Sequence, residues 1–257
     1  MHALARPLFP NPLSPPARHA TIARMTGEVQ REREYERWIR GQGVSSAFIR
    51  WAMTAPGQWA VNSPLMRLPE NLALRAGQRW LDIGCARGAL LRLIDERVGF
   101  DRIPVGVDFS PAVLRLARRD AGRTGRYTAL ACAAATALPF GDQTFDLVTC
   151  GYLMKHLTDE ELDTFLSEVR RVLAGGGLAL LWEFAPSGSG RLDAWNRRWL
   201  GASVKDPYLR PTSMLLHHAQ TAGFEFTRDA ALRPFLFPPI PRASILAGRA
   251  PEGWQPD

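Results

Sequence analysis

From about residue 79 onward, the chain alternates between short apolar runs and longer segments with helical periodicity. Seven strand candidates are found at residues 79–83, 104–107, 127–131, 145–150, 177–184, 224–228 and 243–248. Helices are expected between them at 89–97, 111–121, 159–173 and 212–222. This alternation is typical of a sheet with helices on both faces. We therefore predict an α/β fold with a doubly wound, mainly parallel, seven-stranded sheet.

The segments on either side of this pattern differ from it in composition. Residues 1–23 are proline-rich and form the expected tail, and residues 24–74 have the periodicity of a helical N-terminal cap. The α/β domain is expected to span 75–250, with an insert at 186–211 on the side of the substrate. Aromatic and arginine side chains in that insert suit a flat or acidic organic molecule.

Composition excludes several classes of protein. Three widely spaced cysteines (Cys85, Cys132 and Cys150) provide neither a disulfide framework nor a zinc site, so no metal is expected and a reducing, cytoplasmic location is predicted. No apolar run is long enough for a transmembrane helix. The net charge of +7 comes from arginine in the flanks, without a dense basic run or a nucleic-acid motif. No nucleic-acid partner is therefore expected.

The turn after the first strand is the most informative stretch for function. The strand ends at Asp82 and Ile83, small residues follow, and a helix starts near Gly88. Ligands of open α/β sheets bind just beyond the carboxyl ends of strands, so a nucleotide-like ligand is expected here. Asp82 would repel a pyrophosphate but would attract the ammonium and sulfonium groups of S-adenosylmethionine. The next strand ends at Asp108, whose carboxylate can accept hydrogen bonds from both hydroxyls of a ribose.

At this point the sequence resembles the class I S-adenosylmethionine-dependent methyltransferases, in the group that includes quinone and small-molecule methyltransferases. Five segments match in order: 81–88, 105–110, 134–140, 145–157 and 168–177. The resemblance implies that the first segment holds the methionine part of the cofactor and that strand four faces the methyl group. It assigns ten cofactor-binding positions: Asp82, Gly84, Cys85, Ala86, Gly88, Asp108, Phe109, Ala134, Ala135 and Cys150. Ala86 replaces a glycine that is usual in the family, and Ala134 replaces an acid.

Three side chains near the ends of strands four and five are candidates for catalysis. His156 is the first choice for a base, since imidazole titrates near neutral pH. Tyr152 is expected to face the acceptor, and Glu183 could steer or deprotonate it. A base is required only if the acceptor must lose a proton during methylation.

The sequence thus predicts methyl transfer from S-adenosylmethionine to a small acceptor, with S-adenosylhomocysteine as the other product. The enzyme would act mainly by aligning the reactants. The acceptor is expected to be aromatic, acidic or lipid-like, and the protein to be a monomer or homodimer. Two alternatives remain open: an NAD(P)-dependent oxidoreductase, and a methyltransferase fold that has lost catalysis and acts as a binding module.

Overall fold

The computed structural model describes residues 41–54, 56–57, 74–124, 128–200, 207–232, 240–251 and 253. The predicted tail at 1–23 and most of the predicted cap at 24–74 lie outside these residues.

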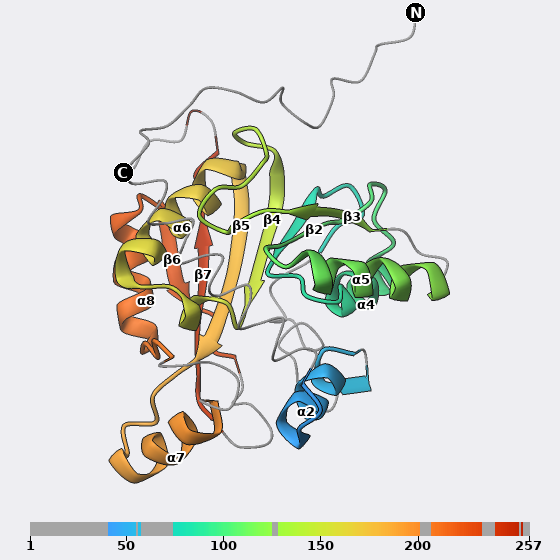
Figure 1. Ribbon diagram of the computed structural model, residues 1–257. Coiled ribbons are helices and arrows are strands. Elements are labelled where there is room, and N and C mark those ends of the chain that lie inside the picture. Colours follow the sequence, from blue (N-terminus) through green and yellow to red (C-terminus); the bar gives the residue numbers. More distant parts are fainter. Residues whose placement is uncertain are drawn as a thin grey trace, which may run out of the picture.

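Helices and strands alternate through the described part of the chain (Figure 1). The strands are β1 (Trp80–Ile83), β2 (Val105–Asp108), β3 (Ala129–Cys132), β4 (Phe145–Gly151), β5 (Leu173–Phe184), β6 (Phe226–Asp229) and β7 (Arg242–Gly248). The helices are α2 (Val44–Ala52), α4 (Ala89–Val98), α5 (Pro111–Thr124), η2 (Met154–His156, a 3-10 turn), α6 (Asp159–Val172), α7 (Gly190–Leu200) and α8 (Thr212–Thr221).

The strands in the described residues form one seven-stranded sheet in the order β3-β2-β1-β4-β5-β7-β6. Neighbours from β3 to β5 are parallel, and β7 runs antiparallel to both β5 and β6. The chain moves outward from β1 through β2 to β3 and then returns to place β4 on the other side of β1. This reversal creates a switch point at the carboxyl ends of β1 and β4, where such sheets bind ligands. The predicted doubly wound, mainly parallel sheet is confirmed.

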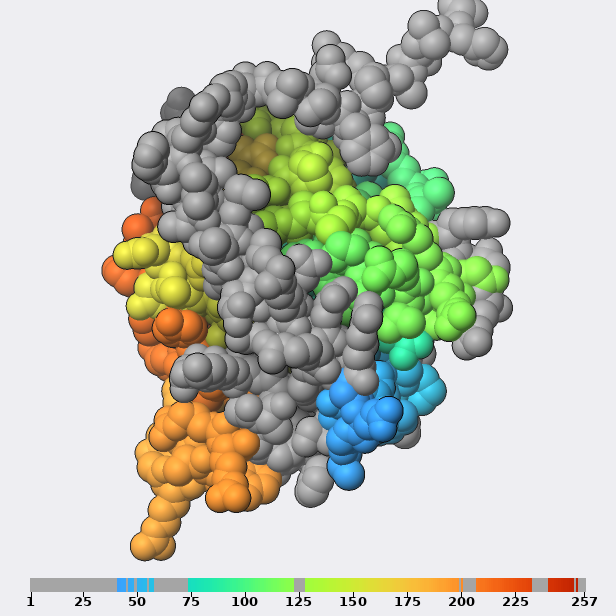
Figure 2. Space-filling view, in the orientation of Figure 1, coloured from blue at the N-terminus to red at the C-terminus, as the bar shows by residue number. Residues whose placement is uncertain are grey.

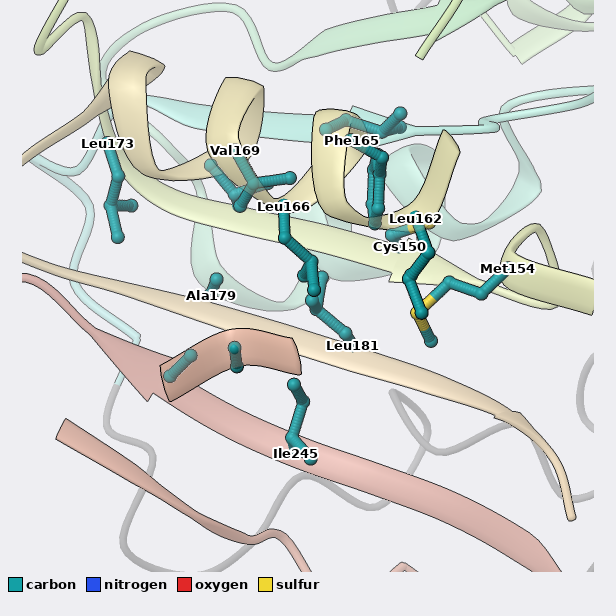
Figure 3. Close-up of a cluster of buried hydrophobic side chains, with 14 of the residues drawn as sticks. Cys150, Met154, Leu162, Phe165, Leu166, Val169, Leu173, Ala179, Leu181 and Ile245 are labelled. Carbon is teal, nitrogen blue, oxygen red and sulfur yellow. The ribbon is translucent and has the colours of Figure 1, made fainter. Parts of the chain in front are cut away.

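Apolar helix faces cover the two sides of the sheet. On one side, α6 and α8 pack on residues of β4, β5 and β7, including Val148, Leu181 and Ile245 (Figure 3). On the other side, Leu91 of α4 and Leu114 of α5 belong to a second buried cluster. Alternating side chains of one strand therefore enter different clusters, as the two-residue period of a strand requires.

Helix α6 forms where the sequence predicts, but the strand after it starts earlier than expected. The Thr158 hydroxyl accepts from the N–H of Glu161, and the Glu161 carboxylate accepts from the N–H of Thr158, so the helix begins with a capping box. The strand was expected at 177–184, with the glycine run at 175–177 separating it from the helix. Instead, α6 ends at Val172, and Leu173 is already extended and paired with Phe145. The glycines lie within the span of β5, where the register with β4 shifts.

Helix α7 lies beyond the carboxyl end of β5, at the same end of the strands as α2 (Figure 1). Figure 2 shows the orange atoms of α7 protruding at the lower left of the molecule, with the blue atoms of α2 at the lower right. It forms the first part of the predicted insert at 186–211, and residues 201–206 of that insert lie outside the described residues. Among the described helices, none is both long and apolar enough to cross a bilayer.

Candidate functional site

The turn after β1 is tied to the end of β2 through its backbone. The N–H groups of Gly84 and Cys85 both donate to the carbonyl of Val107, at 2.8 and 2.9 Å. The next N–H, that of Ala86, donates to Oδ2 of Asp108 at 3.0 Å. These bonds fix the turn against β2 at the switch point of the sheet, so the first two segments of the predicted site lie side by side.

Three residues of this turn have left-handed backbone conformations. The φ angles are 74° at Gly84, 48° at Ala86 and 64° at Gly88. A Cβ on Gly84 would lie 2.9 Å from Cδ1 of Leu153, a flexible end that can shift, so the left-handed φ angle is what favours glycine here. At Ala86 the Cβ makes the same conformation unfavourable by about 1–2 kcal/mol. The turn is therefore strained at the residue where the resembling family has glycine.

Asp82 is buried at the end of β1, with 3% of its surface exposed. Its Oδ1 accepts from the hydroxyl of Thr149 at 2.6 Å. That hydroxyl oxygen accepts in turn from the indole N–H of Trp80 at 2.9 Å, so the carboxylate is held in one orientation. Burial raises the pKa of Asp82 to about 7; the bond from Thr149 opposes this rise, and the charge of Asp108 adds to it.

Asp108 is a second buried acid at the same edge of the sheet. Its Oδ1 accepts from the N–H of Ser110 at 2.9 Å, in addition to the bond from Ala86. Burial raises the pKa of Asp108 to about 6, although these two N–H groups favour the ionised form. A carboxylate has about four acceptor positions, so two remain for a ligand. In the described residues neither acid forms an ion pair.

The positions expected to contact an adenine follow β2 and β3. Phe109, Ala134 and Ala135 are half-buried there. The N–H of Ala133 donates to the carbonyl of Asp108 at 3.3 Å, which places the loop after β3 beside the end of β2. The contacts of these residues with a base stay predictions, and any hydrogen bond from Ala134 would have to come from its backbone.

The side chains of Cys85 and Cys150 point into the protein. The Sγ of Cys85 lies so close to Gly106 that a Cβ there would be 2.8 Å away. Cys150 packs among the core residues beneath α6 (Figure 3). Burial raises the pKa of both thiols well above the ordinary value. These positions therefore present no reactive sulfur to a ligand. In the described part of the chain, no cluster of three or more potential metal ligands occurs.

Tyr152 lies directly after β4 in a left-handed conformation, with φ 58°. Its ring stacks on Phe184, with ring centroids 4.5 Å apart, and meets the edge of Trp182. The phenol oxygen accepts from Nε of Arg242 at 2.5 Å. Burial raises the pKa of Tyr152 despite this arginine. Tyr152 and Phe184 thus form a stacked pair at the carboxyl edge of the sheet, called the aromatic wall below. The neutral phenol of Tyr152 is a poor base.

Glu183 anchors the turn after β4 to β5. Its Oε2 accepts from the backbone N–H of Lys155 at 2.9 Å, and its Oε1 accepts from the N–H of Phe184 at 2.8 Å. Nζ of Lys155 lies 3.7 Å from Oε1, and it also donates to the carbonyl of Tyr152. Burial lowers the pKa of Lys155, and the charge of Glu183 opposes that change. The sequence analysis did not single out Lys155, although it is one of only two lysines in the chain.

His156 is half-buried on η2, the turn that carries Lys155. Arg210 holds this turn from the far end of the insert. Its Nη1 donates to the carbonyl of Met154 at 3.0 Å, its Nη2 to that of Leu157 at 2.7 Å, and it pairs with Asp159 at 2.7 Å. Sequence reasoning missed this contribution because no local pattern connects residues more than fifty positions apart.

Residues 81–177 match a family model described as a methyltransferase domain. This segment of the chain is a class I methyltransferase domain. The match starts within β1 and ends within β5, so it includes the strained turn, both buried acids and the aromatic wall residue that follows β4. The family predicted from the motifs is confirmed for this domain.

Curated relatives of the methyltransferase domain include two enzymes that act on quinones by name. A demethylmenaquinone methyltransferase from Thermus thermophilus is 39% identical over 121 residues, which cover 47% of this chain and 54% of that protein. A 2-phytyl-1,4-naphtoquinone methyltransferase from Thermosynechococcus vestitus is 31% identical over 157 residues, covering 60% of this chain and 64% of that one. The chain thus spans between half and two thirds of the length of these relatives.

Solved structures have the same fold. A phosphoethanolamine N-methyltransferase from Haemonchus contortus, in complex with phosphomonomethylethanolamine and S-adenosylhomocysteine, superposes with a TM-score of 0.60. The aligned region is 22% identical and covers 76% of this chain and 45% of that one. At this identity the likeness establishes the fold, and the predicted Rossmann-like methyltransferase architecture is confirmed.

Proposed function

We propose that this protein transfers a methyl group from S-adenosylmethionine to a ring carbon of a small reduced quinone. The observation that carries the first half of the proposal is the pair of buried acids, Asp82 and Asp108, which have no cationic partner in the described residues. Ionising both acids in a buried site is unfavourable without a positive charge nearby. A cationic ligand supplies that charge, whereas a pyrophosphate would add to the repulsion.

The residues present therefore fit S-adenosylmethionine. We assign Asp82 and the turn at 84–88 to its methionine part, and the remaining acceptor positions of Asp108 to its ribose hydroxyls. Phe109, Ala134 and Ala135 would surround the base. When bound, S-adenosylmethionine supplies an electrophilic methyl group, which requires alignment more than it requires acid or base catalysis.

The acceptor class rests on the aromatic wall and on the names of the relatives. The rings of Tyr152 and Phe184 stack on each other at the carboxyl edge of the sheet and make this edge aromatic. Both relatives named above are called methyltransferases of naphthoquinone-type molecules. A reduced quinone has the electron-rich ring that carbon methylation requires. It is also the small, lipid-like acceptor that the sequence predicts.

Methylation at a ring carbon releases the proton of that carbon, and we assign its acceptance to His156. The other two candidates have different tasks in this arrangement. Both oxygens of Glu183 accept backbone hydrogen bonds, and the phenol of Tyr152 is held by Arg242. Glu183 is then a positioning residue for the turn, and Tyr152 a wall of the acceptor site. A cytoplasmic location and a monomeric or homodimeric state stay predictions.

Two measurements test the proposal. Calorimetry should detect binding of S-adenosylmethionine and of S-adenosylhomocysteine, and no binding of NADP⁺. Binding of NADP⁺ alone would refute the assignment of the two acids and favour an oxidoreductase. Anaerobic incubation with S-adenosylmethionine and 1,4-naphthohydroquinone should then give a product heavier by one CH₂ unit, with equimolar S-adenosylhomocysteine. Cofactor binding without turnover of any quinol would instead favour a binding module.

A further inference from the structure

Helix α7 buries an amide that has no partner in the described residues. Asn196 is 1% exposed, and neither its Nδ2 nor its Oδ1 has a hydrogen-bond partner there. A buried amide without a partner is destabilising, whereas a leucine at the same place would not be. Native proteins pair nearly all such groups, so each exception calls for a specific explanation.

The inward face of α7 shows where this amide points. Asp193, Asn196 and Leu200 are buried at spacings of three and four residues, so they share one face of the helix. Asp193 closes the start of the helix by accepting from the N–H and the hydroxyl of Ser187, both at 2.6 Å. Leu200 lies in a buried cluster with Phe184 at the end of β5, against which Tyr152 packs. Asn196, one turn before Leu200, therefore lies on the helix face that packs toward this cluster.

A second unpartnered donor lies at this edge. The indole N–H of Trp182, 2% exposed, has no partner in the described residues, and its ring meets Tyr152 edge-on. Thr128, the other described residue with such an atom, precedes β3 and so lies at the opposite end of the parallel strands. Of the three described residues with unpartnered buried side-chain atoms, Trp182 therefore lies at the end where the acceptor is expected, and Asn196 lies on the helix beyond it.

We propose that Asn196 is the polar contact of the acceptor subsite and hydrogen-bonds a ring oxygen of the reduced quinone. This inference rests on the proposed function and adds the residue that recognises the acceptor. A carboxamide can donate and accept at once, which suits a phenolic hydroxyl. The stacked pair of Tyr152 and Phe184 then lies beside the acceptor ring as an apolar neighbour, and α7 supplies the group that orients the ring.

The test compares Asn196→Leu with the wild type and with Ala194→Ser, a change at an exposed position of the same helix. Without ligand, the Tm of Asn196→Leu should rise by roughly 2–4 °C, because an unpaired buried amide is removed. The Kd for S-adenosylhomocysteine should stay unchanged. The KM for 1,4-naphthohydroquinone, kept reduced with dithionite, should increase about tenfold through the loss of one buried hydrogen bond. Ala194→Ser should leave all three quantities as they are.

The outcomes separate this inference from the proposed function. A lower Tm for Asn196→Leu would mean that the amide has a structural partner, and an unchanged KM would mean that it does not touch the acceptor; either result overturns the inference alone. Wild-type protein that binds S-adenosylhomocysteine but does not methylate 1,4-naphthohydroquinone would overturn the acceptor class and, with it, this subsite. Wild-type protein that binds no S-adenosylhomocysteine would refute the proposed function.

Discussion

Replacing Asp82 with asparagine should weaken the binding of S-adenosylmethionine and at the same time stabilise the ligand-free protein. Asparagine has nearly the same shape, and its Oδ1 can still accept the hydrogen bond from Thr149. The change removes a charge that is buried without an ion-pair partner in the described residues. If Asp82 is present to bind the ligand, its replacement should raise the stability of the free protein and lower its affinity for the cofactor.

The magnitude follows from the pKa of Asp82, which burial raises from 3.8 to about 7. The difference is about three pKa units, and at 1.36 kcal/mol per unit the buried charge is unfavourable by about 4 kcal/mol as an upper limit. In the unfolded chain the carboxyl ionises near pH 3.8, and in the folded chain near pH 7. Between these values the folded state binds more protons than the unfolded state, so the free energy of unfolding falls as the pH rises from about 4 to about 7. Below about pH 4 the carboxyl is neutral in both states, and the unfavourable term is absent.

At pH 8 the wild type therefore carries the whole unfavourable term, and Asp82→Asn carries none. Urea denaturation at pH 8 should show a higher free energy of unfolding for the variant, by up to about 4 kcal/mol, and the gain should shrink toward pH 5. Calorimetry at pH 8 should show a large loss of affinity for S-adenosylmethionine. Asp101→Asn, at an exposed position, is the matched control and should change neither quantity. A variant less stable than the wild type at pH 8, or one with undiminished affinity, would refute this account of Asp82.

Four further substitutions, two of them combined in one double variant, test other parts of the site. Ala86→Gly should raise the Tm by roughly 2–4 °C because it relieves a left-handed alanine; a fall in Tm would show that the turn is not strained. Glu183→Gln should lower the free energy of unfolding by about 3 kcal/mol, since it leaves Lys155 buried without its anion. Adding Lys155→Met should restore part of that loss, and an additive double variant would exclude coupling between the two residues. Arg210→Lys should lower turnover while leaving cofactor affinity intact, because lysine cannot reproduce the contacts of a planar guanidinium with η2; wild-type turnover would exclude a positioning role.

Much of the methyltransferase domain could be predicted from the sequence because its signals are local. The strand, turn and helix around Asp82 lie within a dozen residues, and their order fixes the switch point of the sheet. The capping box of α6 depends on two residues three positions apart. The start of β5 was placed too late, at residue 177, because pairing between Phe145 and Leu173 starts the strand earlier than the local pattern indicates. Pairing between strands that are distant in the sequence cannot be predicted from a short segment of it.

The polar residues around the expected acceptor site could not be predicted either, because they come from distant parts of the chain. Arg210 reaches the turn after β4 from more than fifty residues away, and Arg242 reaches Tyr152 from the last strand. Aromatic residues and arginines in the insert suggested an acceptor surface, but only the folded chain shows that Asn196 is buried without a partner in the described residues. Burial depends on what packs around a residue, and the sequence of the helix itself does not contain that information.

The distribution of unfavourable groups is itself an argument for a ligand at this edge of the sheet. Elsewhere in the described residues, charged groups such as Asp146 and Glu168 are paired with Arg79 and Arg171. At the carboxyl ends of β1 and β2, by contrast, Asp82 and Asp108 are buried without ion pairs in the described residues. Left-handed backbone alone does not mark the site, because Ala86 and Tyr152 lie at this edge whereas Gln143 and Ala231 have positive φ angles elsewhere. Two adjacent buried acids without a cation are what a site completed by a cationic ligand requires, because binding then stabilises groups that folding alone leaves unsatisfied.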